Sequence, residues 1–145
     1  MKKTARVRDV MSAPVFRLRA DEELIVASKV MNWGKIRHVP VVDEDEHVVG
    51  MVTQRDLLKY AISLWDYGPA TPEGAHPMWG IPIERVMFHP VQTIEADEPI
   101  QEAAYLMRKT RVGCLPVVED GVLVGIVAEY DLLELVEKAA TVARP

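Results

Sequence analysis

Short apolar runs alternate along the chain with stretches whose apolar residues recur at helical spacing. Leu24, Ala27 and Met31 lie three or four residues apart, which predicts a helix that Asp21 caps and Gly34 ends. The runs 39–42 and 48–52 flank the acidic turn 43–46 and predict a β-hairpin. A strand over 15–18 and a second helix over 54–65 complete a β-α-β-β-α pattern.

The second half of the chain repeats this order. It predicts a strand over 91–94, a helix from Asp97 to about Lys109, a hairpin of 115–118 with 123–127, and a helix from Glu129 to about Lys138. Two copies with a long period indicate two equivalent half-domains packed on each other, not a solenoid. The predicted fold class is α/β (α+β), with repeat 1 at 1–65 and repeat 2 at 83–145.

Residues 66–82 have no counterpart in the other repeat. Their four prolines and three glycines exclude regular structure, yet Tyr67, Met78 and Trp79 make the segment unlike a polar linker. Two interpretations stay open. The segment is either an ordered loop that aromatic anchors hold to its own module, or a loop that contacts a partner or covers a ligand.

Composition and charge narrow the functional classes. The 145 residues are 49% hydrophobic and 27% charged, with a net charge of −5, which argues against a general nucleic-acid binder. The single cysteine, Cys114, lies in an apolar run and is expected to be a buried small hydrophobe. The start of the chain develops no apolar signal core and no stretch is long enough to span a membrane, so we expect a cytoplasmic protein.

The local motif richest in chemistry lies where a strand meets a helix, at Thr53-Gln54-Arg55-Asp56. Thr-x-x-Asp is a capping box, in which both side chains bind backbone N–H groups at the helix start. The same geometry suits a nucleotide. A helix N-terminus attracts phosphate, a hydroxyl joins it, and a carboxylate one turn later accepts hydrogen bonds from a ribose. The two interpretations are compatible, and Arg55 adds a cation.

Other candidate chemistry is weaker. The histidines show no short metal-ligand spacing, and the acidic turn 43–46 lacks the ligand pattern of a calcium loop, so we expect no metal site. No nucleophile and base can be paired and no glycine-rich phosphate loop is present, so we expect no enzyme activity.

The repeated motifs closely resemble the cystathionine-β-synthase (CBS) domain, which occurs as tandem pairs called Bateman modules. The resemblance rests on three motifs in the same order: Met-x-x-Pro-Val at 11–15 and 87–91, apolar-x-Pro-Val-Val at 39–42 and 115–118, and Gly-x-Val-Thr-x-x-Asp-Leu-Leu at 50–58. It covers essentially the whole chain outside 66–82 and the last few residues.

The resemblance implies a regulatory, energy-sensing module that requires no cofactor and binds an adenosine-containing ligand such as AMP, ADP or ATP in two clefts between the repeats. Carried over by position, the first cleft takes phosphate and ribose at Thr53, Arg55 and Asp56. Its base would lie against Val91, Val112, Gly113, Leu115 and Pro116. The second cleft would use Asp131 with Ser12, Val15, Phe16, Ile36, Arg37, His38 and Pro40.

The second cleft departs from the family pattern. Ala128 stands where the first repeat has Thr53, and Glu129 adds negative charge where a phosphate would lie. Because a charge-assisted hydrogen bond contributes about 1.5–3 kcal/mol, we expect the first cleft to bind more tightly. The second is expected to be weak, empty or selective for a less anionic ligand.

The resemblance also implies homodimers through the helices and a separate effector protein, with no membrane or nucleic-acid partner. We expect the exposed helix faces around Leu57, Leu58, Ile62 and around Leu132, Leu133, Val136 to associate. The alternative function is a ligand-free interaction module that mediates oligomerisation, and an enzyme acting on a bound nucleotide is a third hypothesis.

Overall fold

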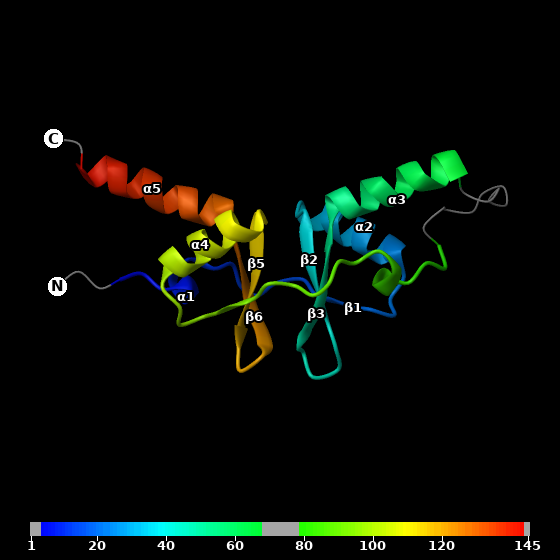
Figure 1. Ribbon diagram of the computed structural model, residues 1–145, viewed down its shortest axis with the longest axis horizontal. Helices are drawn as coiled ribbons and strands as arrows, with labels where there is room; N and C mark the ends of the chain where they lie inside the picture. The colour runs from blue at the N-terminus through cyan, green and yellow to red at the C-terminus, as the bar shows by residue number, and fades with distance from the viewer. Residues whose placement is uncertain (1–3, 68–78, 144–145) are drawn as a thin grey trace. The chain divides into compact units, whose positions relative to one another are not determined.

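The computed structural model describes residues 4–67 and 79–143, so most of the 66–82 segment and both interpretations of it lie outside the described residues. The elements, drawn in Figure 1, are α1 (Val7–Val10), β1 (Leu18–Arg19), α2 (Leu24–Gly34), β2 (His38–Val42), β3 (Val48–Thr53), α3 (Gln54–Tyr67), the 3-10 helix η1 (Ile83–Arg85), β4 (Ile94–Glu95), α4 (Ile100–Thr110), β5 (Cys114–Glu119), β6 (Val122–Ala128) and α5 (Glu129–Ala143).

Each half of the chain forms its own three-stranded sheet, in the order β1-β2-β3 and β4-β5-β6. In both sheets the first pair is parallel and the second is an antiparallel hairpin. The same register recurs, with Val39 opposite Val52 and Leu115 opposite Val127. The predicted mixed α/β fold with a repeated β-α-β-β-α pattern is therefore confirmed.

The compact units of the structure do not follow the order of the sequence repeats. The first unit is Phe16–Val91, and the second unit combines Met1–Val15 with Gln92–Pro145. We call residues 6–15 and 82–91 the opening segments, because each precedes the first strand of its repeat. Each opening segment belongs to the unit that holds the hairpin of the other repeat.

The opening segment 82–91 is built into the first unit by backbone hydrogen bonds. The N–H of Ile83 donates to the carbonyl of Glu22 over 2.8 Å. Phe88 and Met51 exchange two bonds of 3.0 and 3.2 Å, which adds a bridge to the edge of β3. Ile83 is fully buried in the core of this unit, so the segment contributes packing as well as hydrogen bonds.

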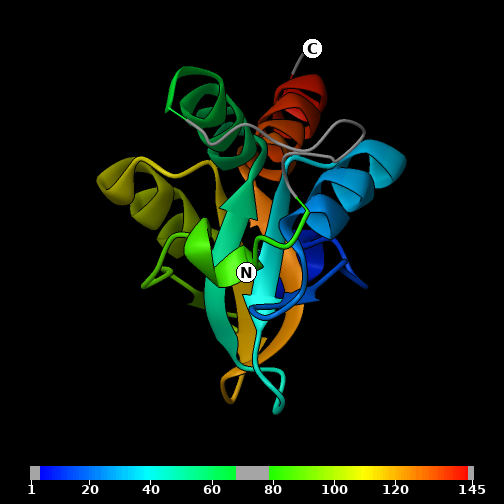
Figure 2. The same ribbon diagram turned by 90° about the vertical axis from the view of Figure 1, so that its right-hand side faces the viewer.

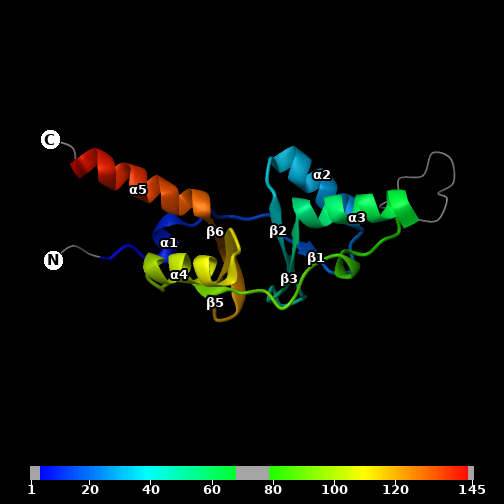
Figure 3. The same ribbon diagram turned by 45° about the horizontal axis from the view of Figure 1, so that its top comes forward.

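The opening segment 6–15 takes the equivalent place in the second unit. Val7 is fully buried in that core, and its N–H donates to the carbonyl of Glu98 over 2.9 Å. Ser12 and Ile126 exchange bonds of 2.8 and 3.0 Å at the edge of β6. Figure 3 shows α1, in dark blue, beside the β4-β5-β6 sheet and its helices. The side chain of Arg8 forms two ion pairs of 2.7 Å there, with Asp97 and Glu119.

Each opening segment also places a methionine on a glycine of the hairpin. A Cβ built on Gly50 would overlap the Sδ atom of Met87 and lie 3.0 Å from its Cγ. In the second unit, a Cβ on Gly125 would lie 2.5 Å from the Sδ of Met11. Only glycine allows the opening segment to approach β3 or β6 this closely.

The two cores have the same construction. Helices α2 and α3 pack side by side against the β1-β2-β3 sheet (Figure 2), and the apolar residues between them are almost entirely shielded from water. The first core centres on Leu24, Val39 and Val52, and the second on Ala103, Leu115 and Val127. Leu57 belongs to the first core and Leu132 packs against the second, so their predicted exposure is wrong.

The predicted helix starts at Asp21 and Asp97 are also wrong. Helix α2 begins at Leu24 and α4 at Ile100, after the extended residues Glu23 and Pro99. The opening segments explain the delay. Pro82 forms a β-bridge with Glu23, and Arg6 forms one with Pro99, so the residues before each helix are held in an extended conformation. Hydrophobic periodicity carries no information about a pairing with a segment so distant in sequence.

Smaller differences concern the ends of elements. The first strand of each repeat is shorter than predicted and lies later in the chain, at Leu18–Arg19 and Ile94–Glu95, where it pairs with the hairpin. Helix α3 continues to Tyr67 and α5 to Ala143, beyond the predicted ends. Trp79, at the described end of the 66–82 segment, is 57% exposed. Ile81 and Ile83 pack on the core of the first unit instead.

We predict that Ile83→Ala lowers the free energy of unfolding by about 2–5 kcal/mol, because it removes a fully buried side chain from the first core. Trp79→Ala, in the same stretch of chain but exposed, should change it by less than about 0.5 kcal/mol. Urea unfolding of both variants measures the difference. Equal, small losses would show that residues 82–91 are only a connection between repeats.

Candidate functional site at the helix starts

The junction between β3 and α3 forms a complete capping box. The backbone N–H and the hydroxyl of Thr53 donate to Oδ2 of Asp56 over 2.9 and 2.8 Å. In return, the N–H of Asp56 donates to Oγ1 of Thr53 over 3.2 Å. Both residues are partly exposed, and these bonds leave the other carboxylate oxygen, Oδ1, unused. The predicted cap is confirmed, and its hydroxyl and carboxylate lie at the start of a long helix.

His38 of β2 and the preceding Arg37 lie beside this box. His38 is directly opposite Thr53 in the sheet register, and the carbonyl of Arg37 accepts the N–H of Gln54 over 2.9 Å. Arg37 and Arg55 are both exposed. The start of α3 therefore combines a helix N-terminus, a hydroxyl, a carboxylate and nearby cations, a combination that suits an anionic ligand with hydroxyl groups.

The equivalent junction of the second unit has the same backbone and different side chains. The N–H of Ala128 donates to Oδ2 of Asp131 over 2.8 Å, but the hydroxyl partner is missing. The N–H of Glu129 donates to the carbonyl of Gly113 over 2.9 Å, as Gln54 does to Arg37. The carboxylate of Glu129 lies over Gly113, with its Oε2 atom 3.5 Å from the position of a Cβ there.

Cys114 occupies the position of His38 in this second junction, opposite Ala128. It is a free, buried cysteine, as the sequence predicts. Burial, and to a smaller extent the nearby charge of Asp131, raise the pKa of its thiol to about 12. The second junction thus has a buried thiol at the place where the first has an imidazole.

Each predicted cleft takes residues from both units. Thr53, Arg55, Asp56 and Val91 lie in the first unit with Phe16, Ile36, Arg37, His38 and Pro40. Asp131, Ser12 and Val15 lie in the second unit with Val112, Gly113, Leu115 and Pro116. The two clefts stay predictions. Within a unit, however, Thr53 neighbours Arg37 and His38, and Glu129 neighbours Gly113, which are pairs that the sequence analysis had assigned to different clefts.

Burial separates residues that can line a site from those that support it. Leu115 has a relative accessibility of 0% and packs in the second core. Pro40 and Pro116 are buried within β2 and β5. Phe16 is 42% exposed and contacts Trp33 edge-on, with ring centroids 5.6 Å apart. Trp33 is itself 77% exposed.

A groove of about 630 Å³ lies between α2 and α3. Its lining includes the cations Lys29, Lys35 and Arg37 and the apolar side chains of Leu57 and Leu58. Thr53 and Asp56 do not line it, but Arg37 and Gln54 do, so the groove adjoins the start of α3. Sequence periodicity did not reveal the groove, because its cations come from α2 and from the segment that follows it.

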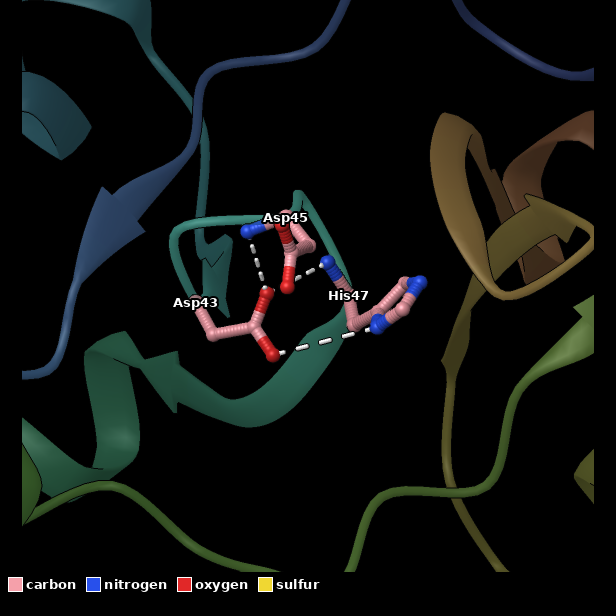
Figure 4. Close-up of side chains that lie close together, drawn as sticks. All are labelled: Asp43, Asp45 and His47. Atoms are coloured by element: carbon pink, nitrogen blue, oxygen red, sulfur yellow. Dashed lines mark hydrogen bonds and ion pairs between the residues drawn. The ribbon is translucent and has the colours of Figure 1, made fainter.

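The acidic turn between β2 and β3 holds a group of potential metal ligands, drawn in Figure 4. Side-chain atoms of Asp43, Asp45 and His47 lie within 4.8 Å of one another. Oδ1 of Asp43 accepts the N–H groups of Asp45 and His47 over 2.9 and 3.0 Å. These bonds, that from His47 first, lower the pKa of the Asp43 carboxyl. The proximity of His47 to the two aspartates was not predicted from the sequence. The carboxylate of Asp43 closes the turn through these hydrogen bonds.

The chain has two β-α-β-β-α repeats that exchange their opening segments, and each repeat has an aspartate at a helix-start junction. These features define a class of tandem-repeat module. The CBS domain model matches residues 7–63 and 83–138, and the chain belongs to the CBS domain family. A CBS domain-containing protein of Dictyostelium discoideum is 38% identical over 141 residues, which is 91% of each chain. The family predicted from the repeated motifs is therefore confirmed.

Solved structures agree with this assignment. The CBS domain pair of protein MJ0100, in complex with 5′-methylthioadenosine and S-adenosyl-L-methionine, is 28% identical, with a TM-score of 0.78 over 94% of this chain and 99% of that chain. A putative acetoin utilization protein (AcuB) from Vibrio cholerae is 30% identical, with a TM-score of 0.81 over 97% of this chain and 98% of that chain.

Other curated relatives are named as enzymes, but this chain spans only 14 to 24% of their length. A CBS domain pair is a regulatory module and not the catalytic part of such proteins. Among the described residues, no helix combines the length and the apolar character needed to cross a bilayer.

We predict that Thr53→Ala lowers the free energy of unfolding by about 0.5–2 kcal/mol, because the box loses its hydroxyl while the helix keeps its N–H groups. Thr53→Ser keeps the hydroxyl and should lose much less. Thermal unfolding without any ligand compares the two variants. If serine and alanine destabilise equally, the methyl group of Thr53 and not its hydroxyl stabilises the junction.

Proposed function

We propose that this protein is a regulatory module that binds an adenosine-containing ligand at its helix-start junctions and passes the resulting change to a separate effector. The observation that carries the proposal is the Thr53–Asp56 box at the start of α3, with bonds of 2.8 and 2.9 Å to one carboxylate oxygen. The membership of the CBS family and the two adenosine compounds bound by the pair of MJ0100 support the same ligand class.

In the first unit, we assign the ribose to Asp56 and a phosphate to the start of α3. Oδ1 of Asp56 is the oxygen that the box leaves for a ribose hydroxyl. Arg37 and His38 are grouped with this site, and not with the second cleft, because they neighbour Thr53 and Gln54 in the sheet. Arg55 remains a further cation for the phosphate, and the residues proposed to hold the base stay as the sequence analysis gave them.

The ligand class can be narrowed from the charges. A hydroxyl, Arg37 and Arg55 at the first junction favour a phosphorylated ligand such as AMP, ADP or ATP over a free nucleoside. Such a ligand would make the module a sensor of cellular energy. A coupling of about 1–3 kcal/mol between ligand and effector is the usual scale for such regulation. The cytoplasmic location expected from the sequence stays a prediction.

We predict that AMP, ADP or ATP raises the melting temperature of the protein, and that Asp56→Ala weakens binding about tenfold or more. A ligand at a hundred times its Kd adds about 2.7 kcal/mol to the folded state, and loss of a charge-assisted hydrogen bond costs about 1.5–3 kcal/mol. Because Asp56→Ala also removes part of the capping box, each shift is measured against the same variant without ligand.

Asp21→Ala is the matched control, since Asp21 is an exposed aspartate that precedes α2. It should keep the full ligand-induced shift. An Asp56→Ala variant that binds as tightly as the parent would remove Asp56 from the site. Absence of any shift with all three nucleotides, and with S-adenosylmethionine and 5′-methylthioadenosine, would reject ligand binding as the function.

Absence of any ligand-induced shift would favour the second candidate function, an interaction module that binds no ligand. Two observations support it: the hydroxyl-free junction at Ala128, and apolar side chains on the outer helix faces. Leu58 and Ile62 of α3 are 59% and 61% exposed, and Leu133 and Val136 of α5 are both 65% exposed. Their spacing of three or four residues places each pair on one helix face.

We therefore propose that the protein forms homodimers through these faces, with or without a ligand. Leu58→Glu should lower the dimer association constant about tenfold or more, because it would bury a charge in an apolar contact. Lys59→Glu, at the adjacent exposed position of α3, is the control for added negative charge. Sedimentation velocity over a range of concentrations reports the constant. A monomeric parent protein would reject the dimer.

A further inference from the structure

The two helix-start junctions share one backbone geometry and differ in charge. In each, the first helical residue donates its N–H over 2.9 Å to the residue before the hairpin, Gln54 to Arg37 and Glu129 to Gly113. In each, the backbone N–H of the last strand residue donates to a carboxylate oxygen three residues later, over 2.9 Å in the first unit and 2.8 Å in the second. A ligand would therefore meet the same main chain at both places.

The side chains at matching positions reverse the charge. The first junction has Arg37, Arg55 and one carboxylate, Asp56. The second has Gly113, Tyr130 and two carboxylates, Glu129 and Asp131. The flanking cations Lys35 and Arg111 occupy equivalent positions before the two hairpins and do not distinguish the junctions.

Glu129 places its carboxylate at the start of α5, the kind of position at which a helix N-terminus binds phosphate. This carboxylate lies over Gly113. The Oε2 and Oε1 atoms are 3.5 and 3.8 Å from the position of a Cβ built on that residue. A helix start attracts an anion through its N–H groups, but a carboxylate already there repels a second anion and attracts a cation. Asp131 keeps the position that Asp56 has toward a ribose.

We propose that Glu129 makes the second junction selective for an adenosine compound without phosphate, and most of all for one with a positively charged 5′ substituent such as a sulfonium. The proposal rests on the proposed function, because it assumes that both junctions bind adenosine. It assigns different ligands to the two units: a phosphorylated one to Asp56 and an unphosphorylated one to Asp131. The discrimination is by repulsion of the wrong ligand as well as attraction of the right one.

Calorimetric titration of the full chain tests this with three ligands: AMP, the neutral 5′-methylthioadenosine, and the sulfonium S-adenosylmethionine. Asp56→Ala serves as the background in which binding at the first junction is weakened about tenfold or more. There, AMP should bind at least about tenfold more weakly than 5′-methylthioadenosine. Adding Glu129→Gln should tighten AMP about tenfold, weaken S-adenosylmethionine several-fold and leave 5′-methylthioadenosine within about twofold.

The reciprocal exchange supplies the matched control. Gln54→Glu in an Asp131→Ala background should weaken AMP at the first junction about tenfold while sparing 5′-methylthioadenosine. Raising the salt concentration should reduce both charge effects, because these side chains are exposed. A purely helix-stabilising role of Glu129 would change the melting temperature of Glu129→Gln and leave the ratio of AMP to S-adenosylmethionine affinity unchanged.

The outcomes distinguish failure of the proposed selectivity from failure of the proposed adenosine-binding function. An unchanged ratio in Glu129→Gln, with binding that Asp131→Ala abolishes, would overturn the selectivity and leave the adenosine module standing. Binding of AMP to the Asp56→Ala background as tight as that of S-adenosylmethionine would also overturn it. If the parent protein binds none of the three ligands, the proposed function fails, and the selectivity fails with it.

Discussion

The fold depends on the exchange of the opening segments between the two repeats. Val7 and Ile83, at equivalent positions, are each fully buried in the core that holds the other repeat's hairpin. Met11 and Met87 then lie so close to Gly125 and Gly50 that a side chain on either glycine would have to displace them. Each unit of some seventy residues gains from the exchange an edge bridge and a core side chain that a small domain can hardly do without.

Sequence reasoning succeeded where the determining contacts are local. The hairpins of 38–53 and 114–128 follow from alternating apolar runs on either side of a polar turn, and the Thr53–Asp56 box follows from a four-residue motif. It failed where a distant segment decides the local backbone. Asp21 and Asp97 resemble helix caps, but the opening segments hold the next residues extended and delay both helices to Leu24 and Ile100.

The same distinction applies to the candidate site. Thr53 and Asp56 follow from a local motif and Asp131 from the resemblance to the CBS domain, whereas their neighbours could be found only from the sheet register. That register places His38 opposite Thr53 and Cys114 opposite Ala128, so each aspartate has neighbours from the hairpin of its own repeat. A duplicated backbone thus carries two chemically different helix starts, one with cations and a hydroxyl and one with an added carboxylate.

The exchange has a further consequence for how such chains can be cut and assembled. The chain passes from one unit to the other twice, at 15–16 and again at 91–92, so a single proteolytic cut at either crossing leaves the units covalently joined. Reciprocal exchange also requires an even number of repeats. A lone copy would expose the edge of its hairpin and leave its opening segment without a sheet, and a third copy would recreate that open edge. We therefore expect the fold to tolerate gain or loss of two repeats together. Gain or loss of a single repeat should destabilise it, because one hairpin edge stays unpaired.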